Sequence, residues 1–212
     1  MSLIQHPASP NLPLAPVEYN FQYQEAFNNV LRLYFNRLNN NLLSLFGTYG
    51  GQYIELPIGS FYDTTDQTAA STTTAYAITL NTTSISSSVS VSNSSQIHFT
   101  YPGYYNFQFS VQLSNLDTAP QDVDIWFRKN GVDIANSNSR FGLAARKTPS
   151  DPFHVLAVAN FIVEVTANDY IELYWCTTST SAKIEYYSAP SSPTRPAIPS
   201  VILTATFVSA IE

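Results

Sequence analysis

The clearest pattern along the chain is an alternation of apolar and polar residues that begins at residue 53 and continues almost to the C-terminus. Between residues 105 and 113 every odd position is apolar, and every even position is Asn, Gln or Ser. A strand with one buried face and one face in water has this period of two. The pattern therefore predicts an all-β body over residues 53–212. We expect its strands at 53–62, 74–81, 85–92, 95–100, 105–113, 123–128, 132–134, 155–165, 170–176, 183–188 and 200–209.

The turns between these strands indicate how the strands pair. Asn130-Gly131 separates two alternating runs, and it predicts a two-residue type I′ hairpin, which requires a positive φ at both positions. A second hairpin is expected across Ala167-Asn168-Asp169. Short strands with turns at regular spacing are typical of an antiparallel sandwich or jelly roll.

Residues 19–46 follow a different period and contain neither Pro nor Gly. The spacing of 4, 3, 4, 3, 4 predicts an amphipathic helix with the a/d seam of a short coiled coil. A solitary helix of this length is marginal in water, so the seam either pairs with other copies or packs on the chain's own β-body. We expect the polar residue of the seam to set register and oligomer number. The seam residues are Phe27, Leu31, Tyr34, Leu38, Asn41 and Leu45.

Two further segments flank the expected helix. Residues 1–18 carry a proline at every third position, which favours an extended polyproline-II arm. The arm is either a floppy terminus or a peptide that lies across a neighbouring subunit. Residues 47–52 contain Gly50-Gly51 and are expected to form a hinge before the β-body. The prolines of the arm are Pro7, Pro10, Pro13 and Pro16.

The composition narrows the possible partners. Only 11% of residues are charged, against about 25% in ordinary soluble domains, so Ser, Thr, Asn, Gln and Tyr must supply the polar surface. Fibres, capsid projections and adhesins commonly have such surfaces. The net charge of −6 argues against a nucleic-acid partner, which needs a basic stripe. The start of the chain lacks the pattern of a signal peptide, and no long apolar run occurs, so we expect cytoplasmic synthesis and no membrane insertion.

The sequence contains no motif that predicts catalysis, a cofactor or a metal site. His6, His98 and His154 lie far apart, and His98 is expected to have a packing role on a strand. The single cysteine, Cys176, is expected to be a small buried hydrophobe. One alternative is calcium binding near the predicted hairpin, where carboxylates cluster. These carboxylates are Asp122, Asp124 and Asp133.

Several aromatic residues are too many to be buried together in one small sandwich. They either pack at contacts between subunits or form a surface that binds sugars or a host envelope, because aromatic rings combine an apolar face with a polar handle. These residues are Tyr101, Tyr104, Trp126, Tyr186 and Tyr187.

Several motifs occur in the order 99–107, 126–131, 167–173 and 199–202. Together they resemble the C1q/tumour-necrosis-factor-like jelly roll over residues 53–209. Asn168 departs from the family's preferred Gly, but Asn also tolerates the left-handed conformation. The segments 59–69 and 195–200 resemble proteins encoded by phages, marine ones in particular. The residues that carry the jelly-roll resemblance are Gly103, Tyr105, Phe107, Trp126, Asn130, Gly131 and Asp169.

The resemblance implies a homotrimer about a threefold axis, with aromatic residues lining the subunit contacts. The seam independently favours two or three parallel partners. We therefore expect a mainly β, non-enzymatic structural protein on the surface of a phage virion, either a head decoration or a fibre-type projection. Residues 1–46 would anchor it to a capsid, portal or tail protein. The alternative is a tail-fibre or tail-spike-like adhesin that recognises a host surface glycan or protein.

Overall fold

The structure is a computed structural model that describes residues 7–46 and 56–211. The chain divides into two compact units, Met1–Glu55 and Leu56–Glu212. The predicted glycine hinge at 47–52 lies outside the described residues.

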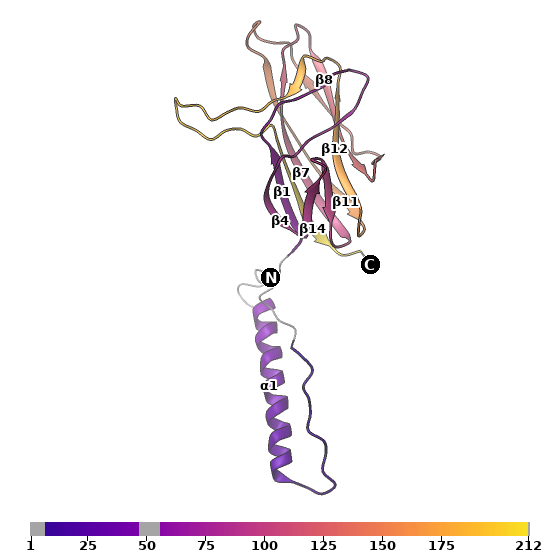
Figure 1. Ribbon diagram of the computed structural model, residues 1–212, viewed down its shortest axis with the longest axis vertical. Coiled ribbons are helices and arrows are strands. Elements are labelled where there is room, and N and C mark those ends of the chain that lie inside the picture. Colours follow the sequence, from indigo (N-terminus) through magenta and orange to yellow (C-terminus); the bar gives the residue numbers. More distant parts are fainter. Residues whose placement is uncertain (1–6, 47–55, 212) are drawn as a thin grey trace. The chain divides into compact units, whose positions relative to one another are not determined.

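The first unit contains one helix, α1 (Phe21–Phe46), preceded by residues 7–20 without helix or strand (Figure 1). The helix begins at residue 21 because Asn20 caps it: the backbone N–H of Tyr23 donates to Asn20 Oδ1 at 3.1 Å. An Asn at this position satisfies one of the free N–H groups of the first turn. The prediction of a helix over 19–46 is confirmed to within two residues.

The second unit consists of two seven-stranded sheets in which the named strands pair antiparallel (Figure 1). In the β7 sheet the order is β2-β13-β7-β14-β1-β4, with β11 on the other side of β7. The strands of this sheet are β1 (Ile58–Asp63), β2 (Gln67–Thr68), β4 (Thr82–Ser87), β7 (Gly103–Asn115), β11 (Phe153–Val165), β13 (Ala182–Ile184) and β14 (Val201–Ser209).

The second sheet, called the β8 sheet here, has the order β10-β8-β12-β6-β5, with β3 paired to β12 and β9 paired to β8. Its strands are β3 (Tyr76–Ala77), β5 (Val89–Ser92), β6 (Gln96–Phe99), β8 (Gln121–Lys129), β9 (Val132–Asp133), β10 (Ser139–Leu143) and β12 (Tyr170–Thr177). The prediction of a mainly β, antiparallel body is confirmed.

The core lies between the two sheets. The predicted alternation on β7 is borne out, because its odd positions from 103 to 113 are buried. Aromatic rings from both sheets meet there: the Phe127 ring centroid of β8 lies 5.5 Å from Phe107 and 6.0 Å from Phe109. Two sheets that bury their inner faces against each other form a β-sandwich.

Several strand predictions differ from the structure. The described part of the strand expected at 53–62 begins at Ile58, the strand expected at 183–188 is only Ala182–Ile184, and β2 was not expected. The expected strand at 85–92 is divided at Ser88, whose φ of 58° turns the chain, so that β4 pairs with β1 and β5 pairs with β6 in the other sheet. The expected strand at 74–81 shrinks to β3. β10 was not expected, because only Phe141 and Leu143 of this short edge strand alternate with polar or small residues.

Gly103 opens β7 at a point where no side chain fits. A Cβ atom at this position would lie 2.5 Å from the Phe207 ring and 2.8 Å from the carbonyl oxygen of Ser209. We expect Gly103→Ala to lower the free energy of unfolding by about 1–3 kcal/mol, because overpacking forces neighbours apart. Urea unfolding measures the change. Gly142→Ala is the control, since its nearest contact would be an ordinary 3.6 Å, and an equal loss in both variants would contradict the prediction.

Candidate functional site

The predicted Asn130-Gly131 turn joins β8 to β9. Asn130 has a φ of 53° and Gly131 a φ of 79°, and Lys129 pairs with Val132 directly across the turn. Two central residues with positive φ are the mark of a type I′ hairpin. This prediction is confirmed.

Asn130 also fastens this hairpin to the turn before β12. Its Nδ2 donates to Asp169 Oδ1 at 2.6 Å, and its Oδ1 accepts from the backbone N–H of Tyr170 at 2.9 Å. Asp169 Oδ2 accepts from the backbone N–H of Thr166 at 2.7 Å and pairs with Lys129 Nζ at 2.8 Å. We call this contact the hairpin latch. The sequence identified both turns but not the contact between them, because the two are about forty residues apart.

The turn before β12 has the backbone conformation expected from its sequence. Asn168 stands where the resembled family prefers Gly, and it adopts a φ of 73°. Asn is among the few residues that tolerate this region. The predicted hairpin across residues 167–169 is nevertheless wrong. β11 pairs with β7 in one sheet, whereas β12 pairs with β8 and β6 in the other, so this turn connects the two sheets.

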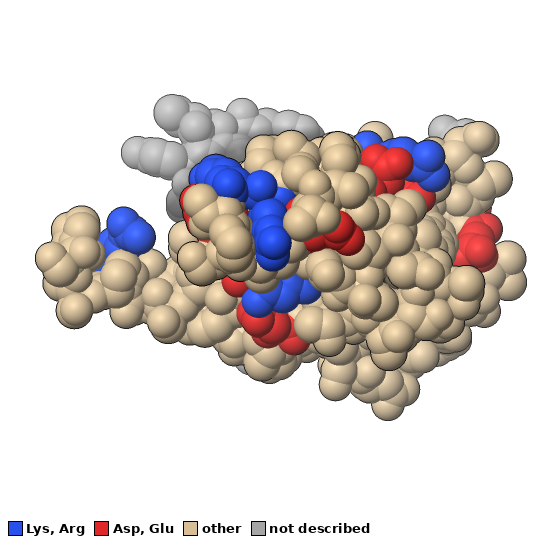
Figure 2. All heavy atoms as spheres, turned by 90° about the horizontal axis from the view of Figure 1, so that it is seen from above, with Lys and Arg blue, Asp and Glu red and all other residues tan. Residues whose placement is uncertain are grey.

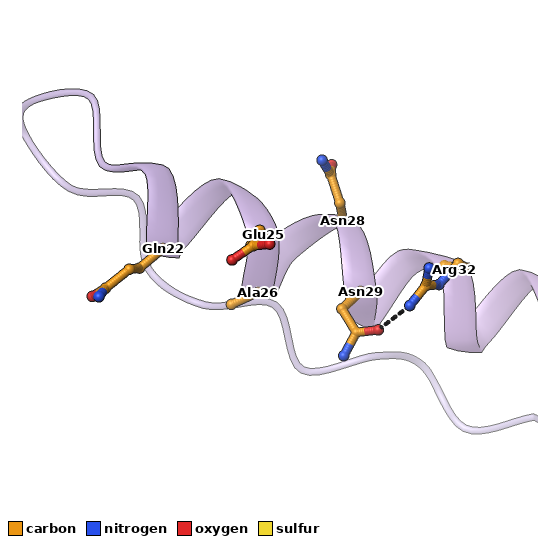
Figure 3. Close-up of a pocket in the computed structure, with 6 residues that line it drawn as sticks. All are labelled: Gln22, Glu25, Ala26, Asn28, Asn29 and Arg32. Carbon is orange, nitrogen blue, oxygen red and sulfur yellow. Dashed lines mark hydrogen bonds between the residues drawn. The ribbon is translucent and has the colours of Figure 1, made fainter.

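In the first unit, the burial of both segments follows their predicted periods. The six seam residues of α1 are half-buried, whereas most residues between them are exposed. Pro7, Pro10 and Pro13 are also half-buried, and Pro16 is exposed. Figures 1 and 3 show the arm running back alongside the helix. The arm thus lies beside its own helix, and both segments are partly buried at the positions that their periods predict. Pairing of the seam with other copies stays a prediction.

The opposite face of α1 is polar. A hollow of about 650 Å³ there is lined by exposed side chains, and Arg32 NH2 donates to Asn29 Oδ1 at 2.8 Å (Figure 3). The described residues around it include no large apolar side chain of the kind that small-molecule sites contain. We do not assign a function to it. The lining residues are Gln22, Glu25, Ala26, Asn28, Asn29 and Arg32.

The outer face of the β7 sheet exposes apolar side chains. Leu156, Val158 and Ile162 project from β11, and Ile162 is 64% exposed. Val158 and Ile202 of β14 flank Ser110 of β7 in the same row of the sheet. The exposed apolar residues are concentrated on β11, with Ile202 and Tyr104 on the neighbouring strands, whereas the outward positions 106–112 of β7 are Asn, Gln or Ser. Exposed apolar patches of this kind mark interaction surfaces.

A polar network connects the start of β11 with β13 and the segment after it. The Tyr187 hydroxyl donates to Glu185 Oε2 at 2.7 Å and lies 2.6 Å from His154 Nδ1. Lys183 Nζ lies between Asp66 Oδ2 at 2.8 Å and Glu185 Oε1 at 2.9 Å. Burial acts to raise the pKa of Glu185, but hydrogen bonds from Tyr187 and Lys183 outweigh it and lower that pKa. Tyr187 and His154, which appeared unrelated in the sequence, are thus brought together.

The outer face of the β8 sheet carries a second hollow, of about 300 Å³, which we call the Trp126 hollow. Trp126 Nε1 donates to Asp133 Oδ1 at 2.7 Å, and Arg128 Nε also donates to that oxygen. Arg140 holds Asp124 through two hydrogen bonds of 3.0 Å each. The apolar part of the lining is Trp126, Ile134 and Cys176, and the polar part is Asp124, Asp133, Asn136 and Asn138.

These contacts bear on the calcium alternative, and the position of Cys176 corrects one expectation. The carboxylates considered for calcium are engaged by arginines, and among residues 7–46 and 56–211 no group of three or more His, Cys, Asp or Glu is placed to hold a metal ion. Cys176 is only half-buried, because the alternation of β12 directs Trp175 into the core and Cys176 outward. Partial burial nevertheless raises the pKa of its thiol.

The remaining histidines have no catalytic arrangement in the described part of the chain. His98 Nε2 lies 2.8 Å from Ser92 Oγ, and its ring packs 5.7 Å from Tyr170, which agrees with the packing role expected for it. His6 lies outside the described residues.

Charged side chains are mixed rather than separated. On the face shown in Figure 2, basic side chains lie beside acidic ones, and the ion pairs include Lys129–Asp169, Arg140–Asp122 and Lys147–Asp151. No helix in the described ranges is both long and apolar enough to cross a membrane. No protein-family model matches the chain, and no curated protein is significantly similar to it.

The hairpin latch predicts a pH-dependent contribution of Asp169 to stability. Burial acts to raise the pKa of Asp169, but hydrogen bonds from Lys129, Thr166 and Asn130 outweigh it and hold that pKa well below its usual range. The stabilisation is therefore present above the unfolded pKa of about 3.9, and it is lost as the pH falls through the folded value.

We expect Asp169→Asn to lower the free energy of unfolding by about 2 kcal/mol at pH 7. The difference from the unmodified chain should narrow as the pH falls below about 4. Urea unfolding over a pH series measures both effects. Asp151→Asn is the control, because Asp151 makes only an exposed ion pair at 3.8 Å, which is worth little. A difference that stays constant with pH would count against the latch.

Proposed function

We propose that this chain is a non-enzymatic structural protein of a bacteriophage particle. Three copies assemble, and residues 1–46 attach them to a capsid, portal or tail protein. The observation that carries the proposal is the outer face of the β7 sheet. There β11 presents apolar side chains to solvent on a 13-residue strand at the edge of the sheet.

The strand order supports a jelly roll. The eight principal strands of the two sheets are β1, β6, β7, β8, β10, β11, β12 and β14, taken as first to eighth in chain order. Within the β7 sheet the order is then sixth-third-eighth-first, and within the β8 sheet it is fifth-fourth-seventh-second. Eight antiparallel strands in two sheets are the arrangement expected of a jelly roll.

Two surfaces support assembly of several copies. An exposed edge strand with an apolar face tends to pair with another chain unless it is covered, and β11 has both properties. The seam of α1 is only half-buried, so partner helices would cover apolar surface that remains accessible. Association would remove apolar area from water at both surfaces, which lowers the free energy of the assembly.

The arm supports the role of an anchor. Leu14 is 96% exposed, and Leu12, Val17 and Tyr19 are exposed as well. An extended, proline-containing segment loses little conformational freedom when it binds, because its backbone is already restricted. The exposed apolar side chains would then pack on the protein of the particle that holds the arm.

A second candidate function is recognition of a glycan on the host surface. One observation favours it: the Trp126 hollow places a half-buried aromatic ring beside several polar side chains on the outer face of the β8 sheet.

We expect Val158→Lys combined with Ile162→Lys to weaken trimer formation at least about tenfold, because both charges would be placed in an apolar contact. Sedimentation equilibrium of the full chain measures the association. The control is Val132→Lys, which alters an apolar residue of the β8–β9 hairpin that is 69% exposed, against 47% for Val158 and 64% for Ile162. A monomeric unmodified chain, or an equal effect of the control, would contradict the proposed contact face.

Deletion of residues 1–46 should abolish attachment to phage particles and leave the β-body folded, because the two units are separately compact. Co-sedimentation with particles measures attachment, and far-UV circular dichroism measures folding. In the full chain, Leu14→Glu with Val17→Glu should also reduce attachment, whereas Asn11→Glu at an exposed polar position should not. Decoration of particles by the truncated chain would rule out the anchor.

A further inference from the structure

The Trp126 hollow combines an apolar wall with polar groups that are held in place. Trp126 is fixed at one end by its hydrogen bond to Asp133, and its ring centroid lies 6.2 Å from the Tyr174 ring. Arg128 covers Tyr174, with 3.9 Å between the guanidinium carbon and the ring centroid. Because these side chains are already ordered, a ligand that packs on Trp126 pays little for immobilising it.

The polar part of the hollow suits a ligand that carries several hydroxyl groups. The Asp124 carboxylate is oriented by Arg140, and each carboxylate oxygen can accept more than one hydrogen bond. Asn136 and Asn138 add amide groups that both donate and accept. Asn138 Nδ2 already lies 3.4 Å from Asp124 Oδ1. Adjacent hydroxyls of a sugar ring present the same mixture of donors and acceptors.

The charges of the lining favour a neutral ligand. Among the described residues that line the hollow, two carry carboxylates and none carries a basic side chain. Hydrogen bonds from Arg128 and Trp126 lower the pKa of Asp133, and Arg128 and Arg140 pair with Asp133 and Asp124. The carboxylates and their arginines therefore balance in charge, which leaves no unpaired positive charge to attract an acidic sugar. A metal cation is disfavoured because the arginines already neutralise both carboxylates. An apolar ligand would leave the carboxylates without the hydrogen bonds that water gives them.

We infer that the Trp126 hollow binds one neutral sugar unit of a larger glycan. The apolar face of the sugar ring packs on Trp126, and its hydroxyls bond to Asp124, Asp133 and Asn138. The volume of about 300 Å³ is at the lower end of the range for small-molecule sites. The inference rests on the second proposed function and names its ligand, and it holds whether or not the chain belongs to a phage particle.

The position of the hollow keeps it accessible in an assembly. The two sheets bury their inner faces against each other, so the outer face of the β8 sheet points away from the apolar outer face of the β7 sheet. Copies that associate through the β7 sheet therefore leave the hollow open. Several copies would present several such sites, which raises the avidity for a surface covered with repeated glycans.

The test is binding of the full chain to an array that carries neutral hexose, N-acetylhexosamine and acidic oligosaccharides. We expect neutral oligosaccharides to bind, and the tryptophan fluorescence to change when the same oligosaccharides are added in solution. The change reports on Trp126, because the other tryptophan, Trp175, is 1% exposed. Trp126→Ala should weaken binding at least about tenfold, as expected for an aromatic anchor.

The control is Tyr101→Ala, which removes an exposed aromatic ring outside the hollow and should leave binding unchanged. If Trp126→Ala does not fold, Asn138→Ala at the exposed rim should still weaken binding. Lack of binding to every neutral glycan, preference for acidic ones, or equal loss in Tyr101→Ala would overturn the inference. Sedimentation and particle attachment test the structural role separately, so failure of one proposal is distinguishable from failure of the other.

Discussion

The second unit depends on the burial of aromatic rings between its two sheets. Tyr105, Phe107 and Phe109 of β7 are fully or almost fully buried and face Phe127 of β8 and Phe99 of β6. Removing one such ring from a packed core typically costs about 3–5 kcal/mol, which is a large share of the stability of a whole domain. Because β7 pairs with β11, β13 and β14, this inner face also fixes the register of most of its sheet.

Fixing the inner face also determines which residues remain outside, since a strand alternates its side chains between two faces. On most strands the outward residues are Ser, Thr, Asn or Gln, as befits a surface in water. β11 departs from this rule with Leu156, Val158 and Ile162, and β8 and β12 depart from it with Trp126 and Tyr174. These departures are the two surfaces for which we propose functions, and the core does not require either of them.

Features that depend on neighbouring residues could be predicted from the sequence. The period of β7, the seam of α1, the Asn130-Gly131 turn and the positive φ of Asn168 are all encoded within a few positions. The hairpin latch, the contact of His154 with Tyr187 and the Trp126 hollow join residues that are distant in the chain, so no local pattern contains them. The passage of the chain from one sheet to the other at Ser88 was not predicted for a different reason. The residues on either side continue the alternation, and only the backbone conformation of Ser88 differs. The outward position of Cys176 could have been predicted from the alternation of β12, because Trp175 takes the inward position.

The turn at Ser88 makes the two sides of the sandwich unequal. There the chain passes directly from β4, at the edge of one sheet, to β5, at the edge of the other, so this side is closed by continuous backbone. On the opposite side, β11 and β10 are joined only through the longer segment 144–152. A molecule with one closed side and one open side can add neighbours in only one direction. Pairing of that one edge with the same edge of another copy would stop at two copies, so a third copy needs contacts on a second surface.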